Sequence, residues 1–278
     1  MKNFTMLLLT AGLLFAAAPS RGADWELVWS DEFDYTGLPD PKKWDYEEGF
    51  VRNQEPQYYT RGRLENARVE SGLLIIEARK EQFKNPRYKP QAAGGKKPAA
   101  PEFARFTSAS LITLNKASWQ YGKMEIRAKL PVSLGIWPAF WAMGINRGQV
   151  GWPRCGEIDI MECWGRRTNE VTATVHFFKE GGHKSNGGKT LSKEPLAQFH
   201  TYALEWNADQ MDFFYDGKKF HSVPVAKLGE GDANAFRKPF YLLLNLALEG
   251  RGKPIDEQAL PQQLVVDYVR VYKAKGSP

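Results

Sequence analysis

The sequence predicts an all-β fold, an antiparallel sandwich of two sheets. Short apolar or alternating segments recur between Gly, Pro, Asn and Asp residues along most of the 278-residue chain, and no long stretch has helical periodicity. The chain has no internal repeat and no linker, and its length suits a single all-β domain. Hydrophobic residues make up 42% of the chain, which is enough for the core of such a sandwich.

Twelve segments are predicted to be strands, because each is short, apolar or alternating, and bounded by turn residues. In chain order they are Glu26–Trp29, Ala67–Glu70, Leu73–Ala78, Ser108–Leu114, Gly122–Leu130, Ile136–Met143, Glu157–Glu162, Val171–Phe178, His200–Trp206, Met211–Tyr215, Tyr241–Leu248 and Val265–Tyr272. The dipeptide Asp216-Gly217 separates two Phe-containing segments and predicts a hairpin turn.

Two segments are predicted to be loops. Residues 82–106 are rich in Pro, Gly, Ala and Lys, which predicts a long surface loop. Residues 181–189 hold four glycines and predict a second, more flexible loop. Either loop is a candidate for the border of a cleft.

The first 22 residues have the features of a signal peptide. Lys2 supplies a positive charge, residues 6–18 form an apolar run, and Ser20-Arg21-Gly22 provides small residues for cleavage. The run is too short for a comfortable membrane span, and no second run follows. We therefore expect residues 23–278 to form one exported domain that is secreted or periplasmic, is monomeric and has no membrane contact after cleavage.

Charge and cysteine usage exclude several classes of function. The net charge is +6, or +4 without residues 1–22, and the basic residues are scattered, which argues against a nucleic-acid partner. Cys155 and Cys163 would lie roughly 26 Å apart along one strand, too far to bridge, so we expect two free, buried thiols. The chain has no Cys/His spacing typical of a metal site.

Three carboxylates occupy six residues in the segment Glu157–Glu162. Glu157 and Asp159 point to one face of a strand, and one extra residue in a β-bulge would bring Glu162 to the same face. A charged, solvent-facing edge is the alternative, but Ile158, Ile160 and Met161 predict that the other face is buried. Trp152 and Trp164 flank the segment, and aromatic rings suit the apolar faces of sugars.

Two such carboxyls are what cleavage of a glycosidic bond requires. One attacks or stabilises the anomeric carbon, and the other protonates the leaving oxygen. Neighbouring carboxylates raise one another's pKa, which keeps one of them protonated as the acid. A calcium site is a competing interpretation, although a rigid strand supplies calcium ligands poorly.

These residues resemble glycoside hydrolase family 16, and within it the laminarinase-like endo-β-1,3-glucanases. Glu157, Asp159 and Glu162 match the longer, bulged form of the family pattern E-x-D-x-(x)-E. The resemblance extends over nearly the whole mature chain. The matching segments are Trp29–Phe33, Asn53–Thr60, Tyr121–Pro131, Gly135–Trp141, Tyr202–Trp206 and Val266–Tyr272.

The resemblance implies a β-jelly-roll, concanavalin A-like, of two curved antiparallel sheets with a substrate cleft on the concave face. It implies retaining endo-hydrolysis of a laminarin-type β-1,3-glucan or a mixed-linkage β-1,3-1,4-glucan, with no catalytic cofactor. Glu157 would be the nucleophile, Glu162 the general acid/base and Asp159 their electrostatic partner. The candidate substrate-binding residues are Trp137, Trp141, Trp164, His176, Asn53, Arg52, Glu55 and Asn245.

The resemblance also implies a structural calcium ion away from the cleft. Glu32 and Asp267 are the matching acids, with a backbone oxygen from Gly72. Phe177-Phe178 after His176 departs from the laminarinase pattern. Two alternatives therefore stay open: hydrolysis of a galactan such as agar, porphyran or carrageenan, and a lectin-like jelly-roll without catalysis.

Overall fold

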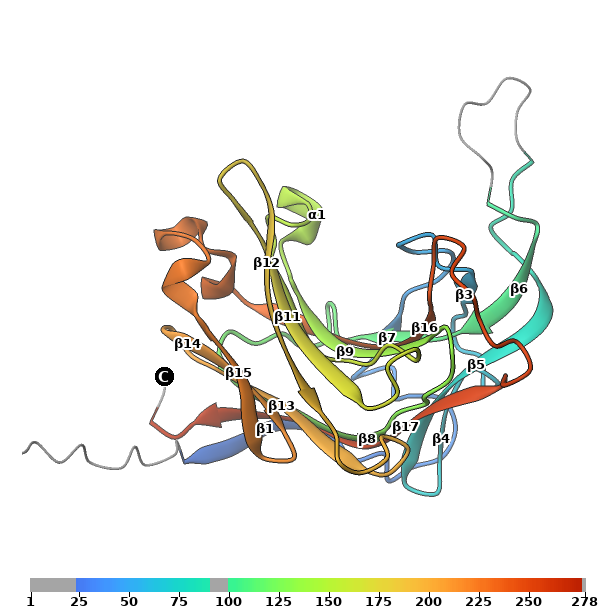
Figure 1. Cartoon of the computed structure of the whole chain (residues 1–278), viewed down its shortest axis with the longest axis horizontal. Helices are drawn as coiled ribbons and strands as arrows, with labels where there is room; N and C mark the ends of the chain where they lie inside the picture. Colours follow the sequence, from blue (N-terminus) through green and yellow to red (C-terminus); the bar gives the residue numbers. More distant parts are fainter. Residues whose placement is uncertain (1–23, 91–99, 277–278) are drawn as a thin grey trace, which may run out of the picture.

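The computed structural model describes residues 24–90 and 100–276, and these residues form a sandwich of two β-sheets (Figure 1). The predicted all-β, jelly-roll fold is confirmed. The predicted signal peptide at 1–22 lies outside the described residues. Within the described ranges, no helix is both long and apolar enough to span a membrane.

The outer sheet has ten strands in the order β15-β14-β13-β8-β17-β5-β6-β3, with β1 paired to β17 and β4 to β5. All its pairs are antiparallel except β3 with β6. Its strands are β1 (Trp25–Asp31), β3 (Gln57–Tyr59), β4 (Ala67–Glu70), β5 (Leu73–Lys84), β6 (Phe103–Ser108), β8 (Gly122–Lys129), β13 (His200–Trp206), β14 (Gln210–Tyr215), β15 (Lys218–Pro224) and β17 (Gln262–Ala274).

The inner sheet has seven antiparallel strands in the order β12-β11-β10-β9-β16-β7-β2. Its strands are β2 (Asp45–Tyr46), β7 (Ser110–Ile112), β9 (Ile136–Gly144), β10 (Glu157–Glu162), β11 (Glu170–Lys179), β12 (Gly182–Leu191) and β16 (Phe240–Leu248). The helical pieces are short: α1 (Arg147–Val150), η1 (Val225–Lys227), η2 (Gly231–Ala233) and η3 (Ala235–Arg237).

Each of the twelve predicted segments contains a strand, and β4, β10 and β13 have the predicted bounds. The predicted hairpin is confirmed between β14 and β15. Asp216 and Gly217 have φ values of 46° and 70°, the left-handed backbone that a two-residue hairpin turn needs.

The prediction of a flexible loop at 181–189 is wrong, because these residues form most of β12. This strand pairs with β11 over ten consecutive positions, from Glu170 opposite Leu191 to Lys179 opposite Gly182. A Cβ atom at Gly188 would lie 2.4 Å from the His221 ring, so this glycine permits close packing rather than mobility.

The loop predicted at residues 82–106 is shorter in the structure, because strands occupy both of its ends. β5 continues to Lys84, and β6 begins at Phe103. The two strands pair in this region, with Lys84 opposite Phe103 and Phe83 opposite Ala104. Residues 91–99 of this segment lie outside the described part of the chain.

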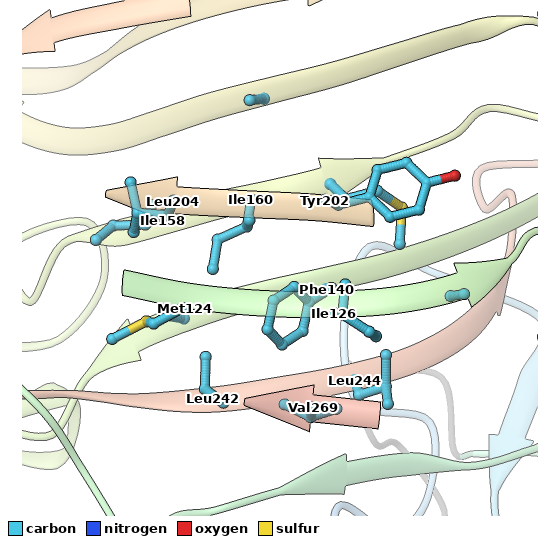
Figure 2. Close-up of a cluster of buried hydrophobic side chains, with 14 of the residues drawn as sticks. Met124, Ile126, Phe140, Ile158, Ile160, Tyr202, Leu204, Leu242, Leu244 and Val269 are labelled. Carbon is cyan, nitrogen blue, oxygen red and sulfur yellow. The ribbon is translucent and has the colours of Figure 1, made fainter. Parts of the chain in front are cut away.

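The main core fills the space between the sheets. Figure 2 shows Phe140, Leu242 and Leu244 of the inner sheet meeting side chains of the outer sheet, such as Met124, Ile126 and Val269. Alternation along β9 sends its other side chains to the opposite face of the inner sheet. There a second, smaller apolar cluster forms around Ala139, Trp141, Met143, Tyr241 and Leu243.

Both cysteines are free and buried, as predicted. Cys155 packs in the small cluster and Cys163 in the main core. Burial raises the pKa of the Cys155 thiol to about 11 and that of Cys163 to about 12, so both are thiols at neutral pH.

Candidate active site

A β-bulge in β10 brings the three acids to one face, as the sequence predicts. On β9 the residue opposite Asp159 is Trp141, and Ala139, two residues earlier, is opposite Glu162. Three residues of β10 therefore span two of β9, which is the definition of a bulge. Ile160 and Met161, which together oppose the single residue Phe140 of β9, are both buried in the main core.

The three acids line a cavity of about 250 Å³ on the curved face of the inner sheet, opposite the main core. β9, β10 and β16 form its floor, and residues 52–55, which precede β3, form one wall. The predicted residues that it brings together are Glu157, Asp159, Glu162, Arg52, Asn53, Glu55, Trp137, Trp141 and Asn245. Their catalytic and binding roles remain predictions.

His176 on β11, a predicted substrate-binding residue, does not line this cavity but contacts the acids Asp159 and Glu157. Its Nε2 lies 3.1 Å from Asp159 Oδ2 and 3.9 Å from Glu157 Oε1. Burial raises the pKa of Glu157, and the positive charge of Arg52, and of His176 when it is protonated, opposes part of that rise. Burial and the charge of Glu157 raise the pKa of Asp159 well above its usual range.

Glu162, like Asp159, is a carboxyl whose protonated form is favoured by burial. Burial, followed by the charge of Asp159, raises the pKa of Glu162 well above the usual range of a glutamate. The indole Nε1 of Trp137 donates a 2.9 Å hydrogen bond to Glu162 Oε1 and opposes part of this rise. Nearby positive charge therefore favours the ionised form of Glu157, whereas burial favours the protonated form of Glu162. A pair of carboxyls in these two states is what acid-assisted catalysis needs.

A hydrogen-bonded network fixes the polar wall of the cavity. Trp141 Nε1 donates to Asn245 Oδ1 at 2.7 Å, and Asn245 Nδ2 donates to the Tyr59 hydroxyl at 3.1 Å. That hydroxyl donates to Glu55 Oε2 at 3.4 Å, and Asn53 Nδ2 donates to Glu55 Oε1 at 3.1 Å. The partners of Asn245 are therefore side chains of the cleft.

Arg52 is held by contacts on two sides. Its guanidinium forms an ion pair with Glu47 and lies 4.9 Å from the centre of the Trp141 ring. The opposing charge of Glu47 raises the pKa of Arg52 above its usual value. Arg52 therefore stays charged beside the acids and lowers the pKa of Glu157.

Trp164 does not line the first cavity but belongs to an adjoining one of about 210 Å³. Its ring stacks on Trp137, with centroids 4.0 Å apart and an angle of 23° between the planes. Trp137 and Asn53 line both cavities, so the two form one continuous groove.

Sequence reasoning missed several residues that line the groove. Trp152 lines the first cavity and is 46% exposed; its position just before the acid segment is a signal that could have found it. Arg147 in α1 and Glu249 after β16 follow no recognisable pattern. His183 lines neither cavity, but its ring lies beside that of His176 with centroids 5.1 Å apart; it lies in the segment predicted to be a loop.

Two places offer metal donors. Donor atoms of Glu157, Asp159 and His176 lie within 4.8 Å of one another, the one such group of three His, Cys, Asp or Glu residues in the described chain. At the predicted calcium position, the carboxylates have cationic partners instead. Arg270 donates to both oxygens of Glu32, at 3.0 and 2.8 Å, and Arg127 to Asp267 at 2.5 Å.

The positions predicted for calcium nevertheless converge at one edge of the outer sheet. Asp31 pairs with Val269, and Leu74 pairs with Val266, so Glu32 and Gly72 both approach the strand that carries Asp267. A carboxylate whose two oxygens already accept from an arginine is a poor calcium ligand. Glu32 therefore does not fit the role of a side-chain ligand.

Comparison with known proteins agrees with this site. The family model described as "Glycosyl hydrolases family 16" matches residues 57–269. A beta-glucanase of Rhodothermus marinus is 42% identical, covering 96% of this chain and 92% of its own. The solved structure of the laminarinase from Rhodothermus marinus has a TM-score of 0.76 and 43% identity, covering 91% of this chain and 99% of that one.

A third similarity points to another substrate. A solved structure described with endo-acting O-glycanases, which members of the human gut microbiota express to initiate mucin breakdown, has a TM-score of 0.81 and 37% identity. It covers 90% of this chain and 91% of that one.

A two-sheet jelly-roll with paired acids in an aromatic-lined groove defines the protein as a glycoside hydrolase. The match over residues 57–269 places it more narrowly, and the chain belongs to glycosyl hydrolases family 16. Its relatives include enzymes named as glucanases, which act on polysaccharides, and glucanases of this family generally need no catalytic cofactor.

Proposed function

We propose that this protein is a secreted, retaining endo-hydrolase of laminarin-type β-1,3-glucan, including mixed-linkage β-1,3-1,4-glucan. The observation that carries the proposal is the bulged strand, which aims Glu157, Asp159 and Glu162 into one groove. The similarity to a beta-glucanase and a laminarinase supports the choice of substrate.

In the first step, a carboxylate oxygen of Glu157 bonds to the anomeric carbon while the glycosidic C–O bond breaks. Glu162 gives its proton to the leaving oxygen, and a covalent glycosyl-enzyme remains. In the second step, water attacks the anomeric carbon, Glu162 takes the proton of that water, and Glu157 departs as a carboxylate. The elevated pKa of Glu162 suits the acid role.

Asp159 and His176 support the nucleophile. Asp159 lies between the two glutamates and contacts His176, which in turn approaches Glu157. Burial raises the pKa of Glu157, and the positive charge of neighbouring side chains offsets part of that rise, which favours the ionised form needed for attack. Trp137, Trp141 and Trp164 supply ring faces, and Asn53, Glu55 and Asn245 supply hydrogen-bonding groups for sugar hydroxyls.

The test is the release of reducing ends from laminarin by the purified protein. Glu157→Gln should abolish release, whereas Glu170→Gln, which removes a carboxylate paired with Arg167 and Lys189 outside the groove, should not. Proton NMR of the first product shows whether the β-anomer is retained. Continued hydrolysis by folded Glu157→Gln would contradict the assignment of the nucleophile.

A second candidate function is endo-hydrolysis of a β-galactoside chain. The similarity to a structure described with mucin O-glycanases favours it, and so do the departures from the laminarinase pattern at Phe177-Phe178. Parallel assays on laminarin, mixed-linkage glucan, agar, porphyran, carrageenan and poly-N-acetyllactosamine, with linkage analysis of the products, separate the two candidates. The three acids in one groove argue against the lectin-like alternative, because a binding module has no need of the second glutamate.

We further propose export to the periplasm or medium, a monomer in solution, and a structural calcium ion beside Asp267. Cell fractionation and light scattering test the first two. For calcium, Asp267 would have to exchange Arg127 for the ion, with backbone oxygens completing the ligand set. A melting temperature that is the same in calcium and in EGTA would refute that part.

A further inference from the structure

Two histidines connect the catalytic acids to the exposed edge of the inner sheet. His176 Nε2 lies 3.1 Å from Asp159 Oδ2, and His176 Nδ1 lies 2.9 Å from His183 Nε2. The side chain of Asp159 is buried, that of His176 is half-buried and that of His183 is exposed. The three side chains therefore form a continuous series of polar contacts from the acids to solvent.

The strand register places His183 beside His176. Glu157 pairs with His176 and His176 pairs with Ser185, so all three side chains lie on one face of the inner sheet. His183 precedes Ser185 by two residues, so it lies on the same face as a diagonal neighbour of His176. The two imidazole planes differ by 24°, which allows an in-plane N–H of one ring to point at an in-plane nitrogen of the other.

Two aromatic contacts hold the end of the β11–β12 hairpin in place. The centre of the Trp152 ring lies 4.6 Å from that of His183 and 6.2 Å from that of His176. Arg154 places its guanidinium 3.5 Å from the centre of the Phe178 ring, and Phe178 pairs directly with His183. These contacts limit the orientations that the His183 ring can adopt.

Two arrangements of hydrogen atoms satisfy the contacts of His176. A neutral imidazole has one N–H donor and one acceptor nitrogen. In the first arrangement, His183 donates to His176 Nδ1, and His176 Nε2 donates to Asp159. In the second, protonated Asp159 donates to His176 Nε2, and His176 Nδ1 donates to His183. The contact with Asp159 does not decide between them, because a carboxyl accepts when it is ionised and donates when it is protonated.

The position of Glu157 favours the first arrangement. His176 Nε2 also lies 3.9 Å from Glu157 Oε1. The first arrangement turns an N–H toward this carboxyl, whereas the second turns a nitrogen lone pair toward it. An ionised Glu157 is attracted by the N–H and repelled by the lone pair. The first arrangement also leaves Nδ1 of His176 bare, and a half-buried acceptor needs a donor, which His183 supplies.

We propose that His183 is a positioning residue for the reaction, whose Nε2–H donates to His176 Nδ1 and so fixes the tautomer of His176 that presents its N–H to Asp159 and Glu157. This inference rests on the proposed function, which requires an ionised Glu157. His183 lines neither cavity, so it acts through His176 and does not contact the substrate. Its loss should therefore change kcat and leave KM unchanged.

Two variants separate hydrogen bonding from packing. His183→Phe keeps a ring beside Trp152 but removes the donor, whereas His183→Gln loses the ring but its amide N–H can still donate to His176. We expect His183→Phe to lower kcat on laminarin by about three- to tenfold, and His183→Gln to retain most of the wild-type value. The reverse order, or no loss in either variant, would overturn the inference. Lys184→Gln is the matched control, because Lys184 is the exposed next residue of β12 and pairs with Glu180.

Nitrogen NMR of the folded wild-type protein tests the tautomer without any substrate. The chain has four histidines, so long-range proton–nitrogen spectra of the histidine-labelled protein are simple, and His176→Asn and His183→Gln assign the two rings. At neutral pH, His176 should carry its hydrogen on Nε2, and His183→Phe should alter its nitrogen shifts. A hydrogen on Nδ1, or on both nitrogens, in wild-type His176 would overturn the inference. Failure of the wild-type protein to cleave laminarin would instead count against the proposed function, and it would leave the NMR result unaffected.

Discussion

The contact between Trp137 and Glu162 predicts a measurable shift in pH dependence. The Trp137 indole N–H donates to Glu162 Oε1 at 2.9 Å and so stabilises the ionised carboxylate. Trp137→Phe keeps an aromatic ring on Trp164 but removes this donor. The pKa of Glu162, already raised by burial, should then rise further.

The size of the shift follows from the energy of such a bond. A hydrogen bond to a charged group contributes about 1.5–3 kcal/mol, and one pKa unit corresponds to about 1.4 kcal/mol. Water entering the space that the indole leaves replaces part of this energy. We therefore expect the pKa of Glu162 to rise by about one unit.

The assay is the pH profile of kcat/KM on a soluble laminari-oligosaccharide. If Glu162 is the general acid, the basic limb marks its ionisation and should move about one unit to higher pH in Trp137→Phe. Trp164→Phe is the control, because Trp164 stacks on Trp137 and the described structure gives it no bond to Glu162. A basic limb that stays in place, or moves to lower pH, would refute the acid assignment of Glu162.

Four further predictions concern stability and reactivity. Burial raises the pKa of Asp159 in the folded state above its value in the unfolded chain. The folded protein therefore loses stability as the pH rises from the unfolded-state pKa to the folded-state pKa. Asp159→Asn removes this cost, so it should raise Tm at neutral pH while lowering kcat. Glu81→Gln should lower Tm at neutral pH, because Arg63 stabilises the Glu81 carboxylate and holds its pKa below the usual value. Equal shifts in Tm for Asp159→Asn and Glu81→Gln would contradict this reasoning. Cys155 and Cys163 should resist a thiol reagent at pH 8 and react only in denaturant; modification of the native protein would show that the thiols are accessible. Gly250→Ala, which puts a Cβ 2.4 Å from a backbone oxygen, should destabilise the fold by about 1–3 kcal/mol in urea unfolding, and an unchanged midpoint would mean that the packing is loose.

The parts of the site that local patterns specify could be predicted from the sequence. The bulge was foreseeable because Ile160 and Met161 are both apolar, so two consecutive residues have to face the core before Glu162 returns to the cleft. The strand limits of β10 follow from the same pattern, since Gly156 precedes it and Cys163 leaves it.

The parts that depend on tertiary packing could not be predicted. β12 has the composition of a loop, and only the approach of His221 to Gly188 explains its glycines. Glu249 is an isolated acid in the sequence, and its pairing with Arg166 crosses 83 positions. Long-range contacts of this kind leave no periodic signal along the chain.

The order of the strands has a consequence for biosynthesis. β17, the last strand, lies between β8 and β5 in the outer sheet, and β16 lies between β9 and β7 in the inner one. Both sheets thus receive an interior strand from residues 240–274, and β1 cannot pair until β17 is present. A chain emerging from the ribosome cannot close either sheet until β16 and β17 have been synthesised, so the two sheets should form together and only after those strands emerge. Until then its unpaired strand edges are exposed to aggregation.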